Sequence, residues 1–119
     1  MVYNESSVEG RDRMGLFSKK KMDSAAAEAF WQWFGEQEER IIEALGRYDM
    51  GIVREIDDHL MPVFPYYDEE LEFQLGFHQG AGEFIFFHLG DKHLSRDSAA
   101  LAGIMPAALK ERWLFTVEE

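Results

Sequence analysis

The stretch that decides the fold is residues 71–89, LEFQLGFHQGAGEFIFFHL. Apolar and polar side chains alternate through its first half, which is the two-residue period of a β-strand with one buried face. The central QGAG supplies the glycines that a tight turn requires, so the stretch predicts a β-hairpin. The expected register places His78 opposite Glu83 and Phe73 opposite His88. One face of the hairpin then collects six apolar side chains: Leu71, Phe73, Leu75, Phe77, Phe84 and Phe86.

The second face of the hairpin is also partly apolar, because Ile85, Phe87 and Leu89 project from it. The run EFIFFHL carries little charge and no proline, and such a run aggregates readily when it is left open. We therefore expect a helix, the chain's own tail or a second subunit to cover this face.

The length and composition limit the class of protein. A chain of 119 residues is long enough for one hydrophobic core and too short for two ordinary domains. The absence of cysteine excludes disulfides and thiolate metal sites and is compatible with a reducing compartment. No apolar run of about 18 residues could span a bilayer, and the first residues lack the apolar core of a signal peptide. We expect a cytoplasmic protein with a single domain over residues 23–119.

The charge is unevenly distributed along the chain. Residues 1–22 hold five Lys and Arg against three Asp and Glu, whereas the remainder holds seven against twenty, a net charge of −13. A surface of that sign repels phosphate backbones and anionic lipids, so neither nucleic acid nor a membrane is an expected partner. Residues 1–22 are polar and show no sustained period, which predicts a flexible N-terminal arm.

Helical periodicity appears in three other segments. Residues 24–45 place Phe30, Trp31 and Phe34 on one apolar stripe, with Asp23 or Ser24 as the N-terminal cap. Residues 50–60 predict a shorter helix, which two prolines then end.

The third helix is expected over residues 95–105, with Ser95 or Asp97 as its cap, and Pro106 ends it. Residues 113–117 alternate as a final strand, and a right-handed crossover would make this strand parallel to the second hairpin strand.

The predicted fold class is therefore α+β, in the order α-α-β-β-α-β. Helices would pack on one face of a small, mixed sheet of about three strands. Such a sheet has two open edges and a partly apolar outer face, so homodimerisation through that face or an edge is the main structural hypothesis.

Three short motifs resemble a small bacterial family. FWQWF at residues 30–34, LEFQLG at residues 71–76 and IMPAALKERWLF at residues 104–115 match its FWxWF opening, its L-x-F-x-x-G strand and its close, which is built on proline, leucine and tryptophan. Met105 stands where the family has alanine. The resemblance implies a genuine domain, and the family has no assigned activity. The motifs are aromatic and apolar, so they indicate packing first.

Glu38 is the carboxylate of most interest, because a charge within the apolar stripe of a helix must be paired, neutralised or hydrated. A buried Glu38 would be a candidate general acid. This leads to an alternative function, in which a small-molecule or hydrolytic pocket between helices and sheet uses Glu38 with His88 or His93. The competing explanation is a helix bend that turns Glu38 outward, or pairing with Arg112 or Lys110.

No metal or cofactor is predicted. The four histidines, His59, His78, His88 and His93, match neither a helical H-x-x-x-H pair nor H-E-x-x-H. The sequence Gly80-Ala81-Gly82 belongs to no phosphate-binding motif, and a hairpin turn explains it. Binding of a cation by the acidic surface is a third possibility.

Because no catalytic motif is present and the hairpin carries more apolar side chains than one layer of helices needs, we expect a non-enzymatic module. It would work by self-association, most simply as a dimer, or by contacting another protein. The expected contact residues are Trp33, Ile85, Phe87 and Leu89.

Overall fold

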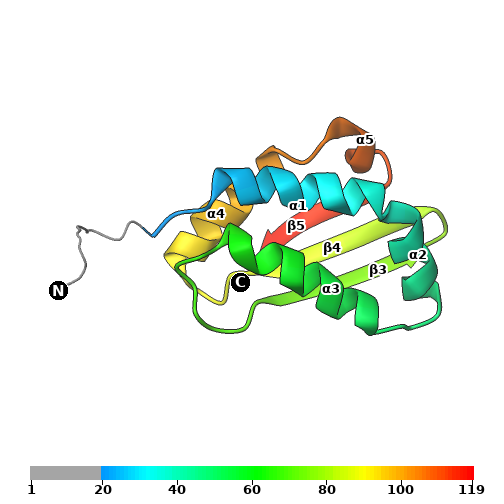
Figure 1. Ribbon diagram of the computed structural model, residues 1–119, viewed down its shortest axis with the longest axis horizontal. Coiled ribbons are helices and arrows are strands. Elements are labelled where there is room, and N and C mark those ends of the chain that lie inside the picture. Colours follow the sequence, from blue (N-terminus) through cyan, green and yellow to red (C-terminus); the bar gives the residue numbers. More distant parts are fainter. Residues whose placement is uncertain (1–19) are drawn as a thin grey trace.

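Alternating side chains build a three-stranded sheet, and all the helices described lie on one side of it (Figure 1). The computed structural model describes residues 20–119. Its elements in chain order are α1 (Ser24–Glu36), α2 (Glu38–Gly46), α3 (Gly51–Leu60), the 3-10 turn η1 (Met61–Val63), β3 (Glu72–His78), β4 (Ala81–Phe87), α4 (Lys92–Gly103), α5 (Ala107–Lys110) and β5 (Trp113–Glu118). Strand β3 pairs antiparallel with β4, and β4 pairs parallel with β5. The predicted α+β class with a mixed sheet is confirmed, whereas most of the predicted N-terminal arm lies outside the described residues.

The pairing of β3 with β4 is shifted by two residues from the predicted register. His78 pairs with Ala81 and Phe73 with Phe86, so the predicted partners Glu83 and His88 were wrong. The cause is a two-residue turn in which Gln79 and Gly80 both have positive φ, at 53° and 81°. Two successive positive φ values are the geometry of a type I′ turn, which matches the twist of the strands that it joins.

The two faces of the hairpin are nevertheless the predicted ones, because a slip of two residues returns every side chain to the same side of the sheet. Phe84 and Phe86 are buried against the helices, while Phe73, Leu75 and Phe77 are half-buried on the same inner face. We call the opposite side the outer face.

The predicted helix over residues 24–45 is divided into two. Asp23 caps α1, because its carboxylate accepts a hydrogen bond from the backbone N–H of Ala26 at 3.0 Å. The chain leaves helical geometry at Gln37, where φ is −101° and ψ is 10°, and α2 begins at the next residue in a new direction. The break lets Glu38 reach β5, a contact described below.

Helix α4 begins earlier than residues 95–105 indicated. The side chain of Asp91 accepts hydrogen bonds from the backbone N–H groups of His93 at 2.9 Å and Leu94 at 3.0 Å, so Asp91 is the cap and neither Ser95 nor Asp97 is. Helix α4 ends at Gly103, before Pro106 as the sequence predicted, and Pro106 precedes α5, a single turn of helix.

Aromatic packing joins α1 to the middle and far strands of the sheet. The rings of Trp31 and Phe115 lie 5.5 Å apart, and those of Phe34 and Trp113 lie 5.0 Å apart, both edge to face. The indole N–H of Trp31 also donates to the backbone carbonyl of Leu101 at 3.0 Å, which fixes α4 beside α1. The helical layer is thus anchored over β4 and β5.

Gly82 makes room for the most important of these rings. A Cβ atom at position 82 would lie 2.3 Å from the indole carbon Cε3 of Trp113, which is far inside van der Waals contact. Trp113 therefore lies directly over the backbone of β4, in contact with Phe77 on one side and Phe34 on the other.

This packing predicts different effects for two glycines of the same hairpin. Gly82→Ala should lower the free energy of unfolding by about 1–3 kcal/mol, because the added methyl group overpacks the core. Gly76→Ala is the matched control, since a Cβ atom there meets nothing within 4 Å, and its effect should stay within about 0.5 kcal/mol. Urea unfolding followed by tryptophan fluorescence measures both. Equal stability of the two variants would contradict the packing of Trp113 over Gly82.

Candidate protein-interaction site

The hydrogen bonds between β4 and β5 show which backbone groups of β3 point away from β4. The N–H of Gly82 donates to the carbonyl of Arg112 at 2.6 Å, and the N–H of His88 donates to the carbonyl of Glu118 at 2.9 Å. Even-numbered residues of β4 therefore direct their polar groups toward β5, and the odd-numbered residues direct theirs toward β3.

It follows that the residues of β3 that pair with even-numbered residues of β4 point their own N–H and C=O groups away from the sheet. These residues are Phe73, Leu75 and Phe77, the partners of Phe86, Phe84 and Gly82. We call this row of outward backbone groups the open edge. An open edge of this length is a template for pairing with another strand.

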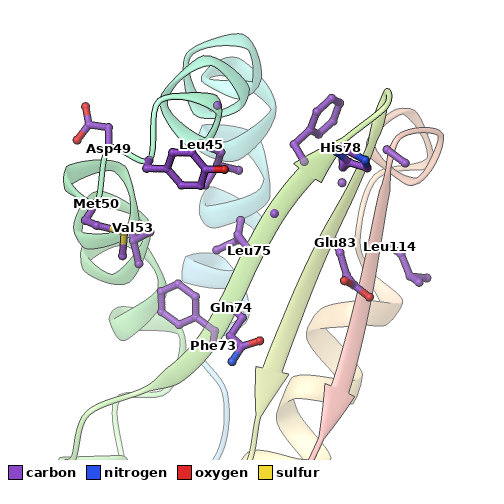
Figure 2. A pocket seen from close by; sticks show the side chains of 16 residues that line it. Leu45, Asp49, Met50, Val53, Phe73, Gln74, Leu75, His78, Glu83 and Leu114 are labelled. Atoms are coloured by element: carbon purple, nitrogen blue, oxygen red, sulfur yellow. The ribbon is translucent and has the colours of Figure 1, made fainter.

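A groove of about 1000 Å³ runs along the open edge. Figure 2 shows Leu45, Met50 and Val53 on the side of α2 and α3, with Phe73 and Leu75 directed toward them from β3. The groove continues past the edge onto the outer face as far as Glu83 and Leu114. It therefore combines an apolar wall with backbone groups that no other strand of residues 20–119 pairs, and these are the two features that an added strand requires.

The corner between α2 and α3 exposes large side chains beside this groove. Tyr48 is 88% exposed and Met50 is 68% exposed, and both line the groove. The charged residues in its lining are Asp49 and Glu83, and neither lysine nor arginine contributes to it. Sequence reasoning missed Tyr48 and Met50, because only the turn of the chain at Tyr48, where φ is 57°, brings them to the edge of β3.

The four predicted contact residues do not form one surface. Ile85 and Phe87 are half-buried on the outer face, and Leu89, just beyond the end of β4, is 52% exposed. Trp33 lies in the helical layer instead. Its ring stacks on that of His59 with the centroids 3.9 Å apart, so one of its faces is already covered.

Glu38 is not brought together with His88 or His93. Its carboxylate accepts a hydrogen bond from the indole N–H of Trp113 at 3.0 Å and pairs with Arg112 at 2.9 Å. Glu38 thus lies at the start of β5, whereas the backbone of His88 bonds to the last residue of that strand. The two are separated by roughly 17 Å at the usual rise of a strand. The pairing with Arg112 is one of the two explanations that the sequence offered for this charge.

Within residues 20–119, no group of three or more His, Asp or Glu side chains could hold a metal ion. The Oδ1 atom of Asp57 is buried without a hydrogen-bond partner. Burial, followed by the nearby charges of Asp58 and Glu70, raises the pKa of the Asp57 carboxyl.

The main buried polar group is Asp97 on α4. Its carboxylate accepts hydrogen bonds from the hydroxyl of Tyr66 at 2.8 Å and from the Nε of Arg96 at 2.8 Å. Arg96 also donates to the backbone carbonyl of Lys20, so the cluster holds the start of the described chain against α4. Every part of this arrangement is explained by packing, and it opens onto no groove described above.

The pKa values of this cluster follow from its contacts. Burial alone would raise the pKa of Asp97, but the hydrogen bonds from Arg96 and Tyr66 outweigh it and lower the pKa below the ordinary value. Burial, and then the hydrogen bond to Asp97, raises the pKa of the Tyr66 hydroxyl.

Comparisons with protein-family models, with curated proteins and with solved structures found no match to this chain. The resemblance of its motifs to a bacterial family therefore stays a prediction. Among the helices described, none is long and apolar enough to cross a membrane.

The contacts of the Asp97 carboxylate should make a contribution to the free energy of unfolding that depends on pH. Asp97→Asn should lower the free energy of unfolding at pH 7 by about 1–3 kcal/mol, because it removes the charge that Arg96 and Tyr66 contact. Since the folded state lowers the pKa of Asp97, this contribution is present above the unfolded value near 4 and is lost as the pH falls below it.

The free energies of unfolding of wild type and Asp97→Asn, measured in urea, should therefore converge as the pH falls from about 5 to about 2. Asp68→Asn, at an exposed position of the connector before β3, is the control and should show little effect at pH 7. If the loss of stability caused by Asp97→Asn did not change with pH, the charge of the Asp97 carboxylate would not be what stabilises the fold.

Proposed function

We propose that this protein is an acidic cytoplasmic interaction module that associates with a second copy of itself through the open edge of β3. The observation that supports this most directly is the row of outward backbone groups on Phe73, Leu75 and Phe77 beside an apolar groove. Pairing β3 with β3 of a second copy would join the two sheets into one. Two exposed edge strands commonly satisfy their backbone N–H and C=O groups by pairing in this way.

A two-fold axis through Leu75 gives the register with the greatest overlap. The strand has seven residues, so an antiparallel pair centred on Leu75 places the whole of β3 opposite its copy. Phe73 then lies opposite Phe77 of the second copy, and Leu75 lies opposite Leu75. All of these side chains are on the inner face and are half-buried in the single chain. The interface is isologous, as a closed dimer requires.

The same register pairs complementary side chains on the outer face. Glu72 lies opposite His78 of the second copy, and the symmetry repeats this contact at the other end of the strand. These are non-hydrogen-bonded positions, where the Cα atoms approach to about 4.5 Å and side chains interact most closely. A carboxylate and an imidazole can share a hydrogen bond, so the edge is complementary to itself even though each copy is acidic overall.

The exposed corner of the helical layer also fits this arrangement. Tyr48 and Met50 line the groove beside the open edge and are among the most exposed apolar side chains of residues 20–119. A strand from a second copy would enter between this corner and β3 and would cover them. Burial of apolar surface supplies the association energy that a short row of backbone hydrogen bonds lacks.

Variants at His78 test this register. His78→Glu should weaken association about tenfold, because it places two glutamates opposite each other at both ends of the strand pair. Adding Glu72→Lys to His78→Glu should restore it, since the charges are then exchanged. Sedimentation-equilibrium ultracentrifugation at 150 mM salt gives the dissociation constants.

Ala29→Glu on α1 is the matched control, because it adds one negative charge at an exposed position of the helical layer. It should change the dissociation constant by less than about twofold. The proposal is wrong if the wild type stays monomeric up to several hundred micromolar. A dimer that all of these variants form equally well would place the interface elsewhere.

A further inference from the structure

The outer face of the sheet is a second surface, which meets the groove of the open edge at Glu83 and Leu114. The five helices described lie on the inner side of the sheet, so no helix of residues 20–119 lies on the outer face (Figure 1). Ile85 and Phe87 project there from the central strand, and Leu114 projects from β5 with 60% of its surface exposed. Together with Leu89 they form what we call the outer band.

The outer band runs along the direction of the strands. Glu83 pairs with Leu114, so the band begins beside residue 83 and follows β4 to Phe87, and Leu89 comes two residues after the strand ends. Its length is about 20 Å at the usual rise of a strand. A helix of about 13 residues has the same length.

Negative charges flank the outer band on both sides. Phe87 lies between Glu72 of β3 and Glu118 of β5, and Glu83 lies at the other end of the band. All three glutamates are exposed. None of the three strands contains a lysine or an arginine, so no positive charge from the strands offsets them.

The combination of apolar side chains and flanking glutamates indicates which kind of molecule the outer face can bind. A second copy placed face to face would bring glutamates of one sheet toward glutamates of the other, which is unfavourable, and anionic lipid or nucleic acid would be repelled in the same way. A segment with an apolar stripe flanked by lysine or arginine meets both features of the surface. We infer that the outer face binds a basic amphipathic helix of a partner protein.

The inference goes beyond self-association and shares only Glu72 among its charged residues with the proposed strand pairing. Pairing of two copies along β3 leaves Ile85, Phe87 and Glu118 free, because these residues lie on the central strand and the opposite edge strand. A dimer would present two outer bands on one continuous sheet, and each copy would bind one helix. Failure of one proposal therefore leaves the other standing.

A model peptide tests the inference on the full chain. The probe is a fluorescein-labelled 18-residue amphipathic peptide of leucine and lysine, and fluorescence anisotropy at 150 mM salt measures its binding. At that ionic strength the Debye length is about 8 Å, so local charges dominate over the net charge. We expect saturable binding with one peptide per chain, and no binding of the corresponding peptide of leucine and glutamate.

Two variants locate the bound peptide. Glu118→Lys and Phe87→Thr should each weaken binding about fivefold, the first by charge reversal and the second by loss of apolar contact. Glu28→Lys, the same charge change at an exposed position of α1, is the control and should weaken binding by less than about 1.5-fold. NMR chemical-shift changes should map to Ile85, Phe87 and Thr116.

Other results would overturn the inference. If Glu118→Lys and Glu28→Lys lowered the affinity for the basic peptide equally, the peptide would be attracted to the acidic protein in general and not to the outer band. Shift changes centred on β3 or on the helices would place the peptide elsewhere. A Phe87→Thr variant that loses dimerisation would show that a second copy occupies the outer face.

Discussion

The packing of α1 on β4 and β5 is the interaction on which the rest of the structure depends. Three aromatic contacts, from Phe30 to Phe84, from Trp31 to Phe115 and from Phe34 to Trp113, place the helical layer over these two strands. Of the helices described, α2 makes the main contact with β3. This is why Phe84 and Phe86 are buried while Phe73, Leu75 and Phe77 are only half-buried, although all five share one face.

The two surfaces left by this arrangement differ in chemistry. Along the open edge of β3, the outward backbone groups pair with no other strand of residues 20–119, and we propose that Glu72 matches His78 of a second copy there. On the outer face the charges are glutamates alone, so like surfaces repel each other there. This difference is the basis for proposing that the chain joins a second copy through one surface and a basic partner through the other.

The sequence predicted the parts of the fold that depend on periodicity. Alternation in residues 71–89 determined which side chains face the helices, and a two-residue slip at the turn left this unchanged because the side-chain period is also two. The break at Gln37 and the early start of α4 were not predictable in this way. The first is a local change of backbone conformation at Gln37, which brings Glu38 to the distant residues Trp113 and Arg112. The second depends on which of three possible caps the chain uses. The groove was missed because it is formed by the approach of Tyr48 and Met50 to an edge strand, which only the tertiary structure establishes.

Amide hydrogen exchange by NMR, measured over a series of protein concentrations, tests the central claim most directly. The account predicts that at micromolar concentration the amides of Phe73, Leu75 and Phe77 exchange rapidly, while those of Gln74 and Gly76, which bond to β4, are protected. As the concentration rises, the first three should become protected together. Strong protection of all five at every dilution would mean that the same molecule already covers the edge. Rapid exchange of Phe73, Leu75 and Phe77 at every concentration would mean that β3 pairs with nothing.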